Sequence, residues 1–148
     1  NKQCIAFLQA KVSLLPVKAK KVKVKSRYLH FFVFIDKDKN TLLQRREGKG
    51  IWQNLYQFPL IETFTKQKQF QKFQLLSLLA DLQITSDFVI NKWNHEPILQ
   101  NLTHQHLEIN FWIVNLTEST NLEIKRSQIH HYPMPKALQN FRDKFFIN

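Results

Sequence analysis

The segment YLHFFVFID, residues 28–36, most constrains the fold, because aromatic and aliphatic residues follow one another with little interruption. A strand with one buried face alternates apolar and polar residues. A nearly continuous apolar run instead predicts a strand that is buried on both sides. We therefore expect such a strand at residues 29–35. DKDKN, residues 36–40, is predicted to turn the chain, and TLLQRRE, residues 41–47, to return as the second strand of a hairpin.

The rest of the chain predicts a mixture of strands and helices. The only two glycines, Gly48 and Gly50, mark a loop that leads into a short strand near residues 56–58. Residues 66–82 carry apolar side chains at intervals of three, which is the strongest helix pattern in the chain. Further strands are expected at residues 89–93, 98–103, 107–114 and 122–126, followed by a short helix with Pro135 near its first turn. This order predicts an α+β fold.

Polar residues of an unusual kind precede the strand predicted at residues 107–114. Within that strand, Leu107, Ile109 and Phe111 alternate with polar neighbours, as a strand with one apolar face should. Just before it, in LTHQH, a hydroxyl and two imidazoles stand close together on Thr103, His104 and His106. A strand does not need these groups, so we treat them as candidate functional residues.

Composition limits the class of protein and of partner. The 148 residues, 43% hydrophobic and including 13 Phe, can fill the core of one globular domain. The 22 Lys and Arg against 11 Asp and Glu leave a formal charge of +11, which favours a polyanionic partner such as nucleic acid. One cysteine, Cys4, excludes an internal disulfide framework. Without a secretion signal or an apolar run of about 20 residues, we expect a soluble cytoplasmic protein that has no membrane partner.

Several motifs, taken in order, resemble one known family. GIWQNLYQFP, residues 50–59, resembles the C-terminal domain of the MutY family of adenine DNA glycosylases, in which a Gly-x-Trp or Gly-x-Leu turn leads into Asn-Leu-(Trp/Tyr)-x-Phe-Pro. LPVKAKKVKVKSR is similar to that family's interdomain connector and LQRREGKG to its preceding hairpin. LTHQHLEINFW resembles its Ser/Thr-His recognition loop, and HHYPMPKALQNF its closing segment. The resemblance spans nearly the whole chain.

The resemblance implies a Nudix-like fold, a mixed β-sheet flanked by helices, and a division of the chain. Residues 1–9 would be the tail end of a catalytic and iron-sulfur domain, 10–26 a basic connector, and 27–148 the recognition domain. Because the chain opens in mid-pattern at Asn1, we expect it to be a piece of a longer protein. Cys4 resembles the last of the family's four 4Fe-4S ligands. A cluster needs four thiolates, so the cofactor is expected in the parent enzyme and none in this fragment.

The implied function is base excision repair of adenine opposite 8-oxoguanine. The parent chain would be an N-glycosyl hydrolase whose catalytic residues lie in its N-terminal domain, so no catalytic residue is expected here. That domain and double-stranded DNA containing 8-oxoguanine opposite adenine would be the partners, in the nucleoid of a bacterial-type cell. The role left for this segment is to read the 8-oxoguanine strand.

Reading 8-oxoguanine makes a definite chemical demand. Guanine presents acceptors at N7 and O6, whereas its 8-oxo form carries a proton on N7 beside a new carbonyl at C8. A hydroxyl can accept a hydrogen bond from the N7 proton and donate one to the C8 oxygen, so Thr103 is a suitable reader. The family's Phe-Ser-His stands here as Leu102, Thr103 and His104, and His104 could fix the loop or contact phosphate. His106 is a further DNA-binding candidate, with a structural histidine or a zinc ligand as alternatives.

The basic connector supplies candidates for contact with phosphate. In an extended chain, alternate residues share a face, and here they are Lys21, Lys23, Lys25 and Arg27. Such cations can follow a DNA backbone, although a charge run can also be simply solvated. We expect Trp52 and Tyr56, near the glycine loop, to pack in the core or between domains rather than to stack on bases.

Two other functions remain open. A stand-alone Nudix pyrophosphohydrolase needs a helix with several glutamates to hold divalent metal, but QFQKFQLLSLLADLQ, residues 69–83, contains only the carboxylate of Asp81. A basic module for single-stranded nucleic acid would need exposed aromatic side chains as stacking platforms.

Overall fold

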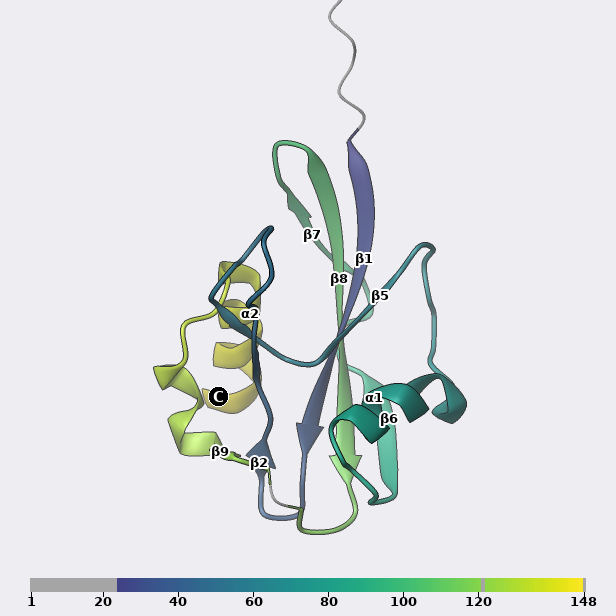
Figure 1. Cartoon of the computed structure of the whole chain (residues 1–148), viewed down its shortest axis with the longest axis vertical. Coiled ribbons are helices and arrows are strands. Elements are labelled where there is room, and N and C mark those ends of the chain that lie inside the picture. Colours follow the sequence, from purple (N-terminus) through teal and green to yellow (C-terminus); the bar gives the residue numbers. More distant parts are fainter. Residues whose placement is uncertain (1–23, 121, 148) are drawn as a thin grey trace, which may run out of the picture.

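Two long parallel strands form the centre of the fold. The computed structural model describes residues 24–120 and 122–147. In it β1 (Lys25–Ile35) pairs with β8 (Gln105–Leu116) along their whole length, from Lys25 opposite Gln105 to Ile35 opposite Asn115. Figure 1 shows the two strands side by side through the middle of the molecule.

Shorter strands extend this pair into a mixed sheet. β5 (Leu60–Thr63) is antiparallel to β1 and lies along its middle, from Tyr28 to Phe31. β6 (Phe88–Lys92) and β7 (Ile98–Asn101) are antiparallel to the second and first halves of β8, respectively. The sheet order is therefore β5-β1-β8-β6, with β7 also paired to β8.

The sheet has a buried core on each face. From β1, Phe31 and Val33 enter one core while Phe32 and Phe34 enter the other, as the alternation of a strand requires. The first core lies under α2 (Lys136–Arg142) and the π-helical turn η5 (Asp143–Ile147). The second lies under the 3-10 turn η3 (Lys72–Leu75) and α1 (Leu76–Asp81). Figure 1 shows α2 and α1 on opposite sides of the sheet. The prediction that residues 29–35 form a strand buried on both sides is thus confirmed. The predicted α+β fold, a mixed sheet flanked by helices, is confirmed as well.

Aromatic stacking fixes α2 against the sheet. The rings of Phe141 on α2 and Phe111 on β8 lie 4.0 Å apart with 7° between their planes, and Trp93 meets Phe141 edge-on at 4.8 Å. Each such pair contributes about 0.5–1.5 kcal/mol beyond burial of its area. Pro135 precedes the helix, and its carbonyl accepts from the amide of Gln139, so the predicted proline start is confirmed.

The predicted hairpin of residues 41–47 with the first strand is wrong. The turn forms, because Asp36 Oδ1 accepts from the amides of Asp38 and Asn40 at 2.9 Å each. The returning chain does not pair with β1, since β8 lines one edge and β5, with the carbonyl of Pro59, lines much of the other. Instead β2 (Asn40–Thr41) pairs with β9 (Ile124–Lys125), and β3 (Gln44–Arg45) pairs with β4 (Tyr56–Gln57).

The helix predicted at residues 66–82 is real but shorter. Helical structure begins only at Lys72, because Phe70 is drawn out of the pattern to lie edge-on to Trp112 at 5.1 Å in the second core. The helix ends as Gln83 takes a φ of 57° and the amide of Ile84 bonds back to the carbonyl of Leu79.

Several predictions concern residues outside the described part of the chain. Cys4, Lys21 and Lys23, the tail at residues 1–9 and most of the connector at 10–26 belong to this group. Within residues 24–120 and 122–147, no helix is long and apolar enough to cross a membrane.

Candidate nucleic-acid interface

The β7–β8 hairpin closes with a two-residue turn. The amide of Leu102 donates to the carbonyl of Gln105 at 2.7 Å, and the reverse bond is 3.4 Å long. Asn101 and His106 form the next pair of the ladder. Thr103 and His104 therefore occupy the turn itself, and Figure 1 shows this hairpin projecting at one end of the sheet. We call it the recognition tip, residues 102–106.

The side chains of the recognition tip fall into two groups. Thr103, His104 and His106 are exposed, and among the described residues none of the three makes a side-chain hydrogen bond within the limits of a normal bond. Leu102 is half-buried and packs against the first core. A hydroxyl and one imidazole thus face solvent on the turn, a second imidazole faces solvent on the adjoining strand, and one apolar side chain anchors the tip. Thr103 shows no cap to the turn backbone in this part of the chain.

The start of β1 lies beside the recognition tip. The amide of Lys25 donates to the carbonyl of His104 at 3.1 Å, and Ser26 lies opposite His106 in the parallel register. Lys25 is exposed. The structure therefore brings together the first described lysine of the basic pattern and the hydroxyl and imidazoles of the recognition tip.

Arg27 is not a free cation of the kind that the alternating pattern predicts. Its Nε and Nη2 donate to the two carboxylate oxygens of Glu62 at 2.8 and 2.7 Å, and its Nη1 donates to Gln105 Oε1 at 2.7 Å. The hydrogen bond to Arg27 lowers the pKa of Glu62, and the same bond raises the pKa of Arg27. Arg27 thus joins β5, β1 and β8 at this end of the sheet, and its charge is paired with that of Glu62 at the surface.

A buried histidine lies in the middle of β1, and sequence reasoning missed it. His30 Nδ1 accepts from Trp112 Nε1 at 3.2 Å, so the ring proton resides on Nε2, which lies 3.1 Å from Thr63 Oγ1. Burial, with a smaller effect of the charge on Lys92, lowers the pKa of His30 to about 4. The ring is therefore neutral at pH 7. Within an apolar run, nothing but the polarity of His30 marked it.

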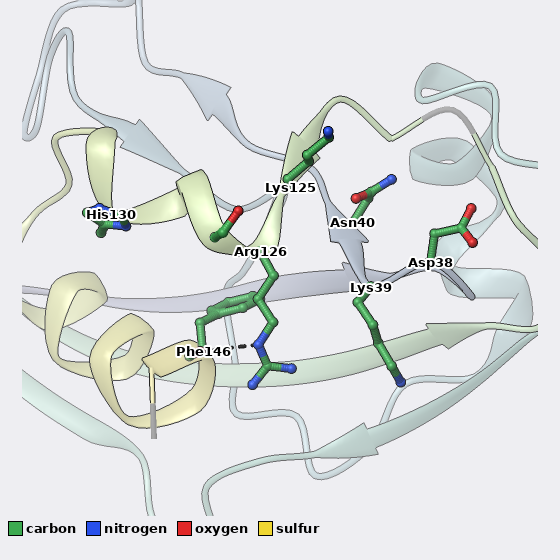
Figure 2. Close-up of a pocket in the computed structure, with 8 residues that line it drawn as sticks. Asp38, Lys39, Asn40, Lys125, Arg126, His130 and Phe146 are labelled. Carbon is green, nitrogen blue, oxygen red and sulfur yellow. Dashed lines mark hydrogen bonds between the residues drawn. The ribbon is translucent and has the colours of Figure 1, made fainter.

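A second basic surface lies at the opposite end of the sheet. A groove of about 940 Å³ is lined from the β1–β2 turn by Lys39 and from β9 and the following 3-10 turn η4 (Arg126–His131) by Lys125 and Arg126. Figure 2 shows the groove, with Arg126 Nε bonded to the carbonyl of Phe146 at 3.1 Å. The 11 residues of β1 span about 33 Å, so this groove is remote from the recognition tip.

The helical segment η3–α1, where the pyrophosphohydrolase alternative needs several carboxylates, contains one. Asp81, the carboxylate of η3 and α1, is exposed. Within the part of the chain that the structure describes, no three His, Cys, Asp or Glu side chains gather as a metal site. The zinc alternative for His106 therefore finds no companion ligands among these residues.

Comparison with known protein families identifies the family of this chain. The model of the NUDIX domain matches residues 30–144. The fold is also similar to the crystal structure of a Nudix hydrolase from M. Smegmatis, RenU, with a TM-score of 0.49 and 8% sequence identity over 82% of this chain and 83% of that one. The family match runs from β1 into η5 and covers most of the chain, which therefore belongs to the NUDIX domain family.

Proposed function

We propose that this NUDIX domain reads 8-oxoguanine in double-stranded DNA, as the recognition domain of an adenine DNA glycosylase that removes adenine opposite the lesion. The observation that carries the proposal is the recognition tip, where the LTH motif of the MutY resemblance forms an exposed turn. Among the described residues the Thr103 hydroxyl and the His104 ring have no side-chain partner, so a ligand can take up their hydrogen bonds.

The lesion and the tip are chemically complementary. The Thr103 hydroxyl accepts from the N7 proton of 8-oxoguanine and donates to its C8 oxygen, a pair of bonds that guanine cannot reproduce. His104 holds the tip or contacts a phosphate. Leu102, where the family has Phe, is half-buried in the first core, so its role here is to anchor the turn rather than to stack on a base.

Phosphate contact comes from the cations beside the tip. Lys25 is exposed and its backbone is bonded to that of His104, so its ammonium group can follow the DNA backbone without reading sequence. Lys21 and Lys23 join it in this proposal on the sequence pattern alone. Arg27 is left out, because its guanidinium is paired with Glu62 and Gln105.

The excision step belongs to the longer protein in this proposal. An N-terminal catalytic domain would break the glycosidic bond and carry the 4Fe-4S cluster, with Cys4 as its last ligand. The described residues would bind and orient the lesion strand. The working location would be the nucleoid, where the substrate is.

Family membership alone is equally compatible with hydrolysis of a nucleoside diphosphate derivative. That chemistry needs several carboxylate oxygens to hold a divalent cation around the diphosphate. Asp81 is the only carboxylate in η3 and α1, and it lies at the end of the helix, exposed. This scarcity of carboxylates favours reading of a lesion over hydrolysis of a nucleotide.

A substitution at Thr103 tests the proposal. In the full-length protein, Thr103→Ala should lower the ratio of affinities for 8-oxoguanine and guanine opposite adenine by about one to two decades, because two base contacts are lost. Thr103→Ser keeps the hydroxyl and should be mild. Binding isotherms on the two duplexes give the ratio, and thermal unfolding checks the fold. A folded Ala variant with the wild-type ratio would refute the proposal, as would magnesium-dependent turnover of 8-oxo-dGTP by the wild type.

A further inference from the structure

Phe64 is the most exposed large apolar side chain in the described part of the chain. It follows β5 directly, and 98% of its surface is open to solvent. Burying a Phe side chain is worth about 1.5–3 kcal/mol, and here the fold forgoes that gain. The ring of Phe64 is therefore available for contact with a partner.

The backbone around Phe64 is held in place from the interior. Thr63 Oγ1 lies 3.1 Å from Nε2 of buried His30 and donates to the carbonyl of Thr65 at 2.7 Å. Because the Nε2 proton of His30 points to Thr63, the hydroxyl can accept that bond and still donate onward. Thr63 and Thr65, on either side of Phe64, thus belong to a series of hydrogen bonds that starts at Trp112 and passes through His30. Phe64 is presented on a braced turn.

Phe64 leaves the sheet at the same end as the recognition tip. Thr63 lies opposite Tyr28 on β1, and Tyr28 lies opposite Glu108 on β8, a few residues from the tip. Two strand spacings separate Thr63 from Glu108, or about 10 Å. Figure 1 shows the loop after β5 rising toward the end where the β7–β8 hairpin projects.

Two cations follow this aromatic ring in the sequence. Lys66 and Lys68 follow it and are exposed, and Lys66 Nζ lies 3.8 Å from Glu108 of β8, which ties the loop to the strand that carries the tip. An exposed aromatic ring followed by an exposed cation suits nucleic acid, because the ring stacks on a base while the ammonium group of Lys68 meets a phosphate.

We propose that Phe64 stacks on a base of the DNA bound at the recognition tip, at a step where the duplex is locally unstacked. This inference rests on the proposed function and adds a contact to it: Thr103 reads the edge of the lesion, and Phe64 covers the face of a base that distortion has uncovered. Apolar side chains that wedge between base steps in this way stabilise distorted DNA.

The test compares two exposed phenylalanines in the full-length protein. Phe64→Ala should lower affinity for a duplex with 8-oxoguanine opposite adenine about tenfold, since base stacking on an aromatic side chain is of that order. Phe64→Trp should stay near the wild type. Phe73→Ala is the matched control, because Phe73 is 70% exposed but lies on η3, and it should leave affinity unchanged. Fluorescence anisotropy measures affinity, and 2-aminopurine beside the lesion reports stacking.

The outcomes separate this inference from the proposed function. If Thr103→Ala loses discrimination while Phe64→Ala binds as the wild type does, the stacking role is wrong and lesion reading stands. An equal loss for Phe64→Ala on an undistorted, fully paired duplex also overturns stacking, because base faces are covered there. If Phe64→Ala leaves DNA affinity intact but lowers the unfolding temperature of the full-length protein, Phe64 packs against another protein domain. If the wild type does not prefer the lesion duplex, the proposed function fails first.

Discussion

The two ends of the β1–β8 pair are both basic, yet they differ in how their polar groups are used. At the recognition tip, Thr103, His104 and Lys25 face solvent on a backbone that is hydrogen bonded on both sides. At the far groove, Arg126 donates to the carbonyls of Phe145 and Phe146 and supports the end of the chain. Positive charge alone does not mark a binding surface. We infer a binding role for the tip because the side chains of Thr103 and His104 are exposed and, within residues 24–120 and 122–147, make no side-chain hydrogen bond.

The largest expected effect is that of acid, which acts through the buried His30 of β1. The pKa of His30 is lowered to about 4 in the folded protein, below the ordinary value of about 6.5, so the unfolded chain binds the proton first. The contribution of His30 to the free energy of unfolding is therefore constant above pH 6.5 and falls as the pH drops from about 6.5 to about 4, by about 3 kcal/mol in total. Urea unfolding at pH 7 and pH 4.5 measures this loss. His30→Gln should show a flatter pH profile, and an unchanged profile would contradict the assignment.

Loss of the Arg27 clamp should have a smaller effect. Arg27→Gln removes the bidentate pair with Glu62, and because Glu62 is about one-third exposed, solvent screening limits the expected loss of unfolding free energy to about 1 kcal/mol. Glu62 has a lowered pKa, so the contribution of the pair is present above the ordinary carboxylate pKa and is lost as the pH falls through the folded value. A double-mutant cycle with Glu62→Gln isolates the coupling. A coupling free energy of zero at low salt would show that the Arg27–Glu62 pair does not contribute to stability.

The smallest expected effect is that of removing a single lysine charge at either end of the β1–β8 pair, and it should appear in the salt dependence of DNA affinity. Lys25→Gln in the full-length protein should lower DNA affinity a few-fold, alike for all sequences, and reduce the slope of log affinity against log salt by about 1. Lys125→Gln removes the same charge at the far groove and should leave the slope unchanged. Titrations at several salt concentrations compare the two. Equal slopes for the two variants would remove the distinction between the ends.

The comparison also shows why some sequence predictions were right and others wrong. The apolar run at residues 29–35 and the alternation at 107–114 led to the two central strands, because burial on a sheet leaves a direct trace in the order of residues. The hairpin at residues 41–47 was wrong because a turn signal is local, whereas the partner of a strand depends on which sheet edges other segments have taken. The helix predicted from residue 66 is shorter for the same reason, because Phe70 packs edge-on against Phe32 and Trp112, which are distant in the sequence.

The sequence by itself determined the family-like order of motifs, the positive charge and the two central strands. Each of these depends on local pattern or composition. Only the tertiary structure decided that Arg27 is paired with Glu62, that Leu102 is an anchor, that His30 is a neutral support for Thr63 and that Phe64 is left fully exposed. These facts depend on residues far apart in the chain that meet across strands, and the free energy of a charge or a ring is set by those neighbours.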